Sequence, residues 1–151
     1  LLTQTLTPDA VSDVCSVMVR GAIASPTSLS FSRALGRADA GCPLTPMPPV
    51  FFERVDFGSR GTVQQLDAVL EAGAASVGVT IRPVDLSRTL VFATSQTVAG
   101  QGAGETSTLG PRLYTSATAI FNLTGSTTVS VQRGETTGAA AFTFSVVELT
   151  P

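Results

Sequence analysis

The sequence predicts an all-β fold, an antiparallel two-sheet β-sandwich of jelly-roll or immunoglobulin-like type with about 10 strands. Glycine, proline and Ser/Thr clusters interrupt the chain at short intervals, and runs of β-branched and aromatic residues lie between them. Several runs alternate apolar and polar residues, which is the two-residue period of a half-buried strand. One such run occurs twice, as TSLSFSR at residues 27–33 and TTVSVQR at residues 127–133. A single domain over residues 1–151 is expected, because a chain of this length builds one core.

The N-terminal segment, residues 1–12, is expected to be a strand or an extension. Within it, Leu1, Leu2, Gln4 and Leu6 are the candidates for an assembly strand, and Leu2, Gln4 and Leu6 would share one face. Such a strand suits either a sheet of the chain itself or the edge of a neighbouring subunit. The sequence leaves both alternatives open.

Two strands and a turn are expected next. Residues 13–24 predict the first strand, SPT at residues 25–27 predicts the turn, and residues 27–33 predict the second strand. Leu29 and Phe31 would point to one side of that strand and the serines between them to the other.

A long loop and a strand follow. Residues 36–49 contain four prolines, a density that no helix or central strand tolerates. Residues 50–57, VFFERVDF, resume as a strand whose buried face would carry Phe51, Glu53, Val55 and Phe57. A carboxylate on that face requires an arginine partner or a position at a sheet edge.

Residues 63–70 and 76–81 predict a β-hairpin turned at EAGAA. The alternative is a helix over residues 63–70, with Leu66, Val69 and Leu70 as its apolar stripe and Gly73 as its C-terminal cap. RPVD at residues 82–85 predicts a turn, and TLVFA at residues 89–93 predicts a short buried strand.

Residues 97–111 predict a glycine-rich exposed loop, a natural place for recognition. Its candidate recognition residues are Gly100, Gln101, Gly102, Gly104 and Glu105. Strands are expected at residues 113–123, 127–133 and 139–149. NLT, which begins at Asn122, matches the acceptor sequence for N-glycosylation.

The doubled motif predicts an internal duplication. A strand, a small turn, the T-x-[LV]-S-[FV]-x-R stretch, a loop and an aromatic strand occur once over residues 17–57 and again over residues 117–149. Duplication of a three-stranded unit would give two related sheets that face each other. A chance match in a chain rich in threonine and serine is the alternative.

Composition favours a subunit that buries its surface against neighbours. Only 13% of the residues are charged, all nine basic residues are arginine, and the net charge is −2. An uncharged surface of threonine, serine, glycine and alanine is easy to desolvate, although a GC-rich genome would also favour arginine over lysine. The acidic balance argues against nucleic acid, and no apolar run is long enough to cross a membrane as a helix. Because the chain begins at Leu1, we expect a processed product or part of a longer gene product.

Cys15 and Cys42 predict one disulfide and, with it, an extracellular location. The alternative is two buried thiols.

No catalytic motif is found, and no cofactor or metal site is expected. The chain has no histidine, so acid–base chemistry would fall to its well-separated carboxylates or to a cysteine. Glu53 and Glu148 are interpreted as members of ion pairs or as edge residues. The spacing of GQGAGE at residues 100–105 fits neither a dinucleotide-binding nor a phosphate-binding loop.

The run RGTV…VTIRPVDLSRTLVF…VSVQRG…FTFSVVEL, over residues 60–149, resembles β-modules of secreted bacterial fibre-like proteins and of virion or tail-fibre surface proteins. The resemblance implies a structural or adhesive role and carries over no catalytic residue. The proline-rich segment at residues 36–49 departs from it.

The sequence therefore predicts a non-enzymatic structural subunit that self-assembles into an extracellular filament, fibre or coat. The first alternative is a carbohydrate- or receptor-binding adhesion module on a cell or virion surface, with its site in residues 97–111. A small carboxylate-dependent hydrolase is a third hypothesis.

Overall fold

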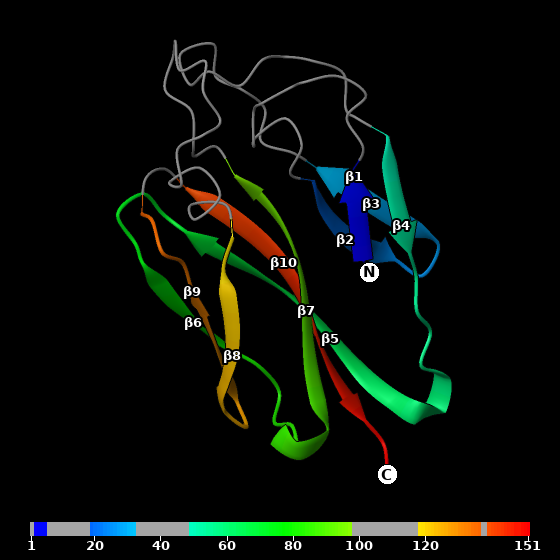
Figure 1. Cartoon of the computed structure of the whole chain (residues 1–151). Coiled ribbons are helices and arrows are strands. Elements are labelled where there is room, and N and C mark those ends of the chain that lie inside the picture. The colour runs from blue at the N-terminus through cyan, green and yellow to red at the C-terminus, as the bar shows by residue number, and fades with distance from the viewer. Residues whose placement is uncertain (1, 6–18, 33–48, 98–117, 137–138) are drawn as a thin grey trace.

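The computed structural model describes residues 2–5, 19–32, 49–97, 118–136 and 139–151, with side chains described outside residues 2–5 and 95–97 (Figure 1). These residues form strands and two short 3-10 helices, so the predicted all-β class is confirmed. The strands are β1 (Leu2–Thr5), β2 (Arg20–Ser25), β3 (Ser28–Ser32), β4 (Val50–Glu53), β5 (Gly61–Leu70), β6 (Ser76–Thr80), β7 (Thr89–Thr97), β8 (Ile120–Gly125), β9 (Thr128–Gln132) and β10 (Ala140–Leu149). The 3-10 helices are η1 (Gly58–Arg60) and η2 (Leu86–Arg88).

The strands pair antiparallel in four separate sheets. Two sheets have three strands, in the orders β5-β10-β7 and β6-β9-β8, and two have two strands, β2-β3 and β1-β4. The antiparallel all-β arrangement agrees with the prediction. The described strands form four sheets where two were predicted, because β1 to β4 form two small sheets of their own.

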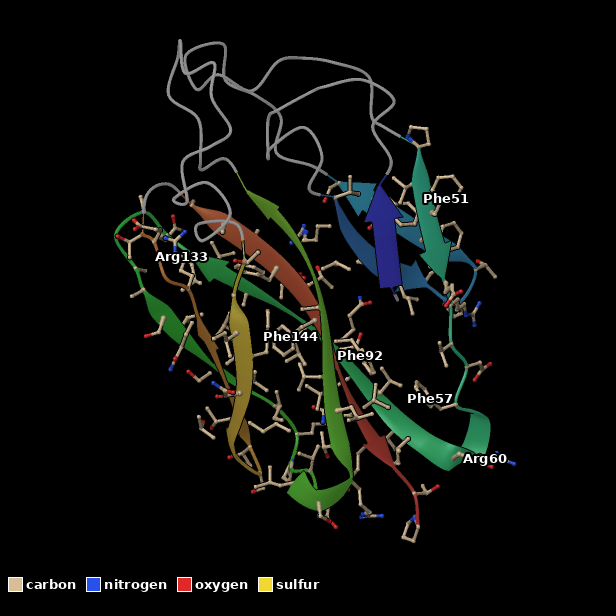
Figure 2. The ribbon with its side chains drawn as sticks, in the orientation of Figure 1. Phe51, Phe57, Arg60, Phe92, Arg133 and Phe144 are labelled. Carbon is tan, nitrogen blue, oxygen red and sulfur yellow. The ribbon has the colours of Figure 1, made fainter. Side chains whose placement is uncertain are left out.

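The hydrophobic core lies between the two three-stranded sheets. Phe142, Phe144 and Val146 alternate along β10 and point toward β9, where Val129 and Val131 are fully buried. Figure 2 shows Phe144 between the sheets. The ring of Phe121 on β8 lies 5.6 Å from that of Phe142 and 5.4 Å from that of Phe144. Burial of each large apolar side chain contributes about 1.5–3 kcal/mol, so this layer dominates the stability of the fold.

Residues 63–70 and 76–81 are strands, but the predicted hairpin between them is wrong. β5 pairs with β10 and β6 pairs with β9, so the connection crosses from one sheet to the other. Gly73 bends this connection with a φ of 89°, a conformation that favours glycine. The helical alternative is also wrong, because residues 61–70 are continuous strand.

The guanidinium of Arg133 holds the crossing connection in place (Figure 2). It donates to the carbonyl oxygens of Glu71 at 2.7 Å, Ala74 at 2.9 Å and Thr136 at 3.4 Å. The backbone N–H of Gly73 donates to the same Thr136 carbonyl at 2.9 Å. Arg133 is buried, and this burial lowers the pKa of its guanidinium. A buried cation that donates to carbonyl groups at both ends of the connection stabilises the crossing between the two sheets.

The two copies of the doubled motif have the same hairpin geometry. In β2-β3, Gly21 pairs with Phe31 and Ile23 with Leu29, and the register shifts between Ile23 and Ser25. In β8-β9, every pair recurs 100 positions later, and the register shifts between Leu123 and Gly125. The third strands differ, because β4 pairs with β1 whereas β10 is the central strand of its sheet.

Other strand boundaries depart from the predictions. The strand expected over residues 50–57 ends at Glu53, and its face is not buried, since Phe51 and Val55 are 56% and 55% exposed. The strand at residues 89–93 extends as β7 and lies at a sheet edge, where Leu90 is half exposed. The strand expected from residue 113 is described only from Ile120, since residues 113–117 lie outside the described part. The closing strand at residues 139–149 is confirmed as β10.

Candidate functional site

The candidate site lies on the outer face of the β5-β10-β7 sheet, opposite the core. Because side chains alternate along a strand, the odd-numbered residues of β5 and β10 face outward. One half of this face is polar, with Gln65, Asp67, Thr94 and Thr143 on neighbouring strands. The other half is apolar, and its members are Val63, Leu90, Phe92 and Val147.

The polar half is covered by the edge of β2. The Thr94 hydroxyl accepts from the Gly21 N–H at 3.1 Å and donates to the Gly21 carbonyl at 3.0 Å. The Gln65 amide does the same for Ile23, accepting from its N–H at 2.8 Å and donating to its carbonyl at 3.1 Å. Two side chains thereby take the place of a paired strand at the open edge of β2, which leaves those main-chain groups satisfied.

An ion pair closes the far end of this contact. The Thr143 hydroxyl donates to Asp67 Oδ1 at 2.6 Å, and Arg20 Nη1 lies 3.7 Å from the same oxygen. Asp67 is largely exposed, so the pair contributes less to stability than to the orientation of β2.

The apolar half is only partly covered and contains a pocket of about 240 Å³. Residues 54–58 arch over it from one side and Ile23 borders it on another. Figure 2 shows Phe57 on this arch and Phe92 on β7. The lining residues are Ile23, Arg54, Val55, Asp56, Phe57, Gly58, Gly61, Val63, Phe92, Ser145 and Val147.

Local hydrogen bonds fix the arch. Asp56 Oδ1 accepts from the Gly58 N–H at 2.9 Å, and the Arg60 N–H donates to the Phe57 carbonyl at 2.9 Å. Gly58 has a φ of 53°, which glycine adopts without strain. At Gly61 the chain comes so close to β10 that a Cβ atom would lie 3.0 Å from the Glu148 carbonyl. The arch is therefore a built turn that leaves apolar side chains open.

Apolar exposure continues from the pocket toward β4. Phe51, Phe52, Val55 and Val63, which we call the 51–63 apolar surface, are 56%, 48%, 55% and 43% exposed. Phe52 contacts Phe31 of β3 with ring centroids 5.3 Å apart, while Phe51 points away (Figure 2). Phe51 and Phe52 lie on opposite faces of β4, so apolar side chains are exposed on both sides of this strand and beside the pocket. In the described residues, β4 pairs only with β1, so its second edge has no strand partner.

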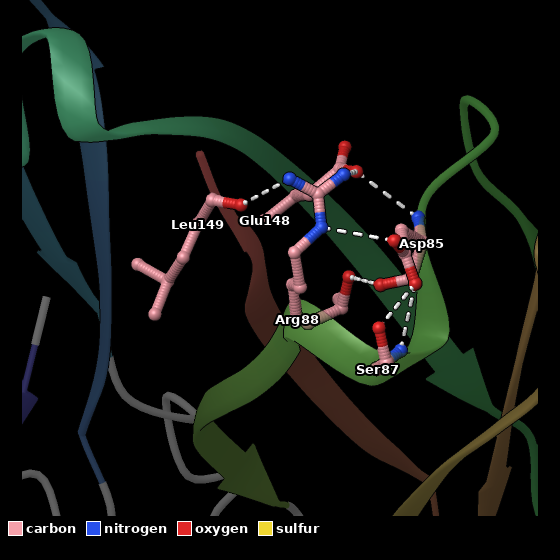
Figure 3. A network of polar contacts seen from close by, with 6 residues as sticks. Asp85, Ser87, Arg88, Glu148 and Leu149 are labelled. Carbon is pink, nitrogen blue, oxygen red and sulfur yellow. Dashed lines mark hydrogen bonds and ion pairs between the residues drawn. The ribbon is translucent and has the colours of Figure 1, made fainter. Parts of the chain in front are cut away.

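The carboxylates that come together do so in a structural network (Figure 3). Arg88 donates from Nε to Asp85 at 2.9 Å, from Nη2 to Glu148 at 3.2 Å and from Nη1 to the Leu149 carbonyl at 3.1 Å. Glu148 Oε1 also accepts from the Asp85 N–H at 3.1 Å. The network joins η2 to β10, and it confirms an ion pair for Glu148.

Asp85 caps η2 within this network. Ser87 donates to its carboxylate from the hydroxyl at 2.7 Å and from the backbone N–H at 2.9 Å. The Ser87 hydroxyl, its N–H and then Arg88 lower the pKa of Asp85 below its ordinary value. Ser87 and Arg88 are residues of η2, so the lowered pKa of Asp85 follows from the hydrogen bonds with which it caps this helix.

Glu53 lies at the end of β4 and is exposed. Of the two interpretations of Glu53, an ion pair or an edge position, the structure agrees with the edge position. The guanidinium of Arg133 is bound to carbonyl groups of the crossing connection instead of to Glu53.

Most residues predicted as sites fall outside the described part of the chain. These are Leu1, Leu6, Cys15, Cys42, Gly100, Gln101, Gly102, Gly104 and Glu105. The disulfide and the recognition loop therefore remain predictions. Leu2 and Gln4 lie in β1, where they pair with Glu53 and Phe51 of the same chain. Asn122 is exposed on β8.

Sequence reasoning missed the pocket. A signal was present in RVDFG at residues 54–58, where Arg54 and Asp56 alternate with Val55 and Phe57 before a glycine. The alternation predicts a half-buried strand, whereas β4 ends at Glu53 and the Asp56–Gly58 turn that follows leaves the apolar side chains half covered.

No family model, curated protein or solved structure matches this chain. Among the described residues, no cluster of three or more His, Cys, Asp or Glu side chains could hold a metal ion. The same residues include no helix with the length and apolar character required to cross a membrane.

Proposed function

We propose that the chain is a non-enzymatic structural subunit that self-assembles into an extracellular filament, fibre or coat. The observation that carries the proposal is the 51–63 apolar surface, in which Phe51 and Val55 are more than half exposed beside an edge of β4 that no described strand fills. Soluble monomers rarely leave several large apolar side chains exposed within one short segment.

The composition supports the same function. With 13% charged residues, few groups must lose their hydration when two subunits meet. The interface would combine apolar burial at Phe51 and Val55 with main-chain pairing along β4. β1 and β4 are the two strands of one sheet, and the exposed side chains of Phe51 and Val55 lie on β4 or just after it, which favours β4 over β1 as the strand that meets a neighbour.

The architecture that we propose for this subunit is layered. β5-β10-β7 and β6-β9-β8 are the two sheets of a sandwich, because they share the core. We place β2-β3 and β1-β4 in a third layer, over the outer face of the β5-β10-β7 sheet. The matching registers of β2-β3 and β8-β9 support an origin by duplication of a three-stranded unit.

Sedimentation velocity over a dilution series tests the proposal. The wild-type chain is expected to form species larger than a monomer that dissociate on dilution. Val55→Glu should raise the concentration needed for association at least tenfold, because it places a charge where apolar area must be buried (about 1.4 kcal/mol). Ile120→Glu is the matched control, since Ile120 is 65% exposed but lies on β8. A wild-type chain that stays monomeric at every concentration would overturn the proposal.

The pocket favours an adhesion module as the second candidate. Phe57 and Phe92 offer apolar ring faces, and Arg54, Asp56 and Ser145 offer polar groups in the same lining. A sugar ring presents hydroxyl groups and an apolar face together, which suits such a lining. Binding of a glycan panel by the wild-type chain, lost in Phe92→Ala, would favour this candidate, and an inactive panel would remove it.

A further inference from the structure

Among the strands that the structure describes, none pairs with the outer edge of β3, and the main-chain groups along that edge can be identified. The N–H and C=O groups of Gly21 and Ile23 point away from β3, toward Thr94 and Gln65. Their partners in the hairpin are Phe31 and Leu29. In an antiparallel pair these are non-hydrogen-bonded positions, so the N–H and C=O groups of Leu29 and Phe31 point to the outer edge of β3. Within the described residues, no strand pairs with that edge.

The equivalent edge of the second hairpin is filled. β6 pairs with β9, placing Val77 opposite Val131 and Val79 opposite Val129. The pairing extends beyond β6 at both ends, because Ile81 N–H donates to the Thr127 carbonyl and Arg133 N–H to the Ala75 carbonyl, each at 2.9 Å. The N–H and C=O groups of the odd-numbered residues of β9 therefore point toward β6. Leu29 and Phe31 are the equivalents of Val129 and Val131, 100 positions earlier.

We propose that a second copy of the chain fills this edge with its own β3. The two β3 strands would pair antiparallel about a two-fold axis at Ser30, with Leu29 of each copy opposite Phe31 of the other. The result is a continuous four-stranded sheet, β2-β3-β3-β2, across the two copies. This inference rests on the proposed function and identifies one interface through which the subunits associate.

The side chains of β3 suit this partner. The strand that fills the equivalent edge presents an apolar, a small and an apolar residue: Val77, Gly78 and Val79. β3 presents the same order in Leu29, Ser30 and Phe31. Residues 28–32 contain no charge, so the two copies meet without like-charge repulsion. An aromatic residue opposite an aliphatic one is a favourable cross-strand pair.

The inferred register makes a self-complementary contact. In this register Leu29 and Phe31 are hydrogen-bonded pairs and the two Ser30 residues are a non-hydrogen-bonded pair, with Cβ atoms about 4.5–5.5 Å apart. β3 and the 51–63 apolar surface would then give each subunit two interfaces. Two interfaces on each subunit allow a chain of subunits to extend, which a single two-fold contact does not.

A charge-swap experiment tests the axis at Ser30. Ser30→Glu and Ser30→Lys each place like charges against each other, and each is expected to weaken association at least tenfold in sedimentation velocity. An equimolar mixture of the two variants should restore association, since every contact then joins opposite charges. Ser130→Glu is the matched control, because Ser130 is the equivalent position in the hairpin whose edge β6 fills.

The outcomes separate the two proposals. Association as strong as that of the wild-type chain in both Ser30 variants overturns the β3 interface and leaves self-assembly standing. So does a mixture that associates no more strongly than either variant alone. A monomeric wild-type chain overturns both. Circular dichroism of each variant shows whether it folds, and restored association in the mixture excludes loss of folding as the cause.

Discussion

The two hairpins β2-β3 and β8-β9 have one register and two different environments. Both turn after a register shift, and their pairs match 100 positions apart. Yet Val129 and Val131 are fully buried in the middle of a three-stranded sheet, whereas Leu29 and Phe31 are half buried on a strand whose outer edge has no partner among the described strands. The alternating pattern determines the hairpin, and the strands around it determine how much of the hairpin is buried.

The two hairpins also contact opposite faces of the β5-β10-β7 sheet, and they do so through different kinds of interaction. β9 packs its apolar side chains against Phe142 and Phe144 on the inner face. β2 presents its main-chain edge to Thr94 and Gln65 on the outer face. Apolar packing seals one face, while hydrogen bonding on the other covers the polar half and leaves the apolar half open.

Matched charge substitutions test the difference in burial and have the largest expected effect. Val131→Asp places a carboxylate in the sealed core and should cost about 4 kcal/mol or more, enough to unfold a marginally stable domain. Phe31→Asp at the equivalent position should cost about 1–2 kcal/mol, because Phe31 is only half buried. Urea unfolding of the two variants measures both costs. Equal losses would contradict the difference between the hairpins.

Arg133→Met tests why the chain crosses between sheets after β5. The substitution removes the donors to three carbonyl groups and should cost about 3 kcal/mol. Arg133→Lys should recover only part of this loss, because one ammonium group cannot match the geometry of the guanidinium. Chemical denaturation gives the free energies of unfolding. An unchanged free energy of unfolding in Arg133→Met would show that the connection is stable without the guanidinium.

Thr94→Val tests the docking of β2. It removes a hydroxyl that bonds both main-chain groups of Gly21 while keeping the shape of the side chain, and it should cost about 1–2 kcal/mol. Faster hydrogen exchange at the Gly21 amide should accompany the loss. Thr150→Val is the control, since the Thr150 hydroxyl makes a single exposed bond to the Ser59 carbonyl at 3.2 Å. Unchanged exchange at Gly21 would show that β2 is held by other contacts.

The smallest expected effect is a pH dependence that is independent of both hairpins. The pKa of Asp85 is lowered in the folded chain from an ordinary value of 3.8, so its contribution to stability is complete above that value. The contribution is lost as the pH falls through the lower folded pKa. In urea titrations below pH 3.8, Asp85→Asn should therefore lose less stability than the wild-type chain. Parallel pH profiles for the two would contradict the cap.

The sequence predicted strands well and their partners poorly. Alternation located β3, β9 and β10, and the doubled motif pointed to two equivalent hairpins, because each is a local pattern. The pairing of residues 61–70 was missed, because their partner strand β10 begins at Ala140, far along the chain. Glu148 was recognised as a residue that needs a partner, but Arg88 could be identified only once η2 was folded against β10.

The pocket was missed for a related reason. Residues 50–57 alternate as a buried strand would, but β4 ends at Glu53, and Val55 and Phe57 then border an opening on another sheet. Which face of a strand is covered depends on chain that lies elsewhere in the sequence. The alternation in VFFERVDF is the same for a covered and an uncovered strand, and only the glycine that follows it indicates a turn.

Hydrogen exchange at four amides, measured at low and high protein concentration, tests the comparison most directly. We expect the amides of Val129 and Val131 to be protected at both concentrations, because β6 fills their edge. The amides of Leu29 and Phe31 should exchange quickly in dilute protein and become protected as the concentration rises and a second copy pairs with β3. Amides of Leu29 and Phe31 whose exchange is independent of concentration would contradict the use of β3 as an associating edge.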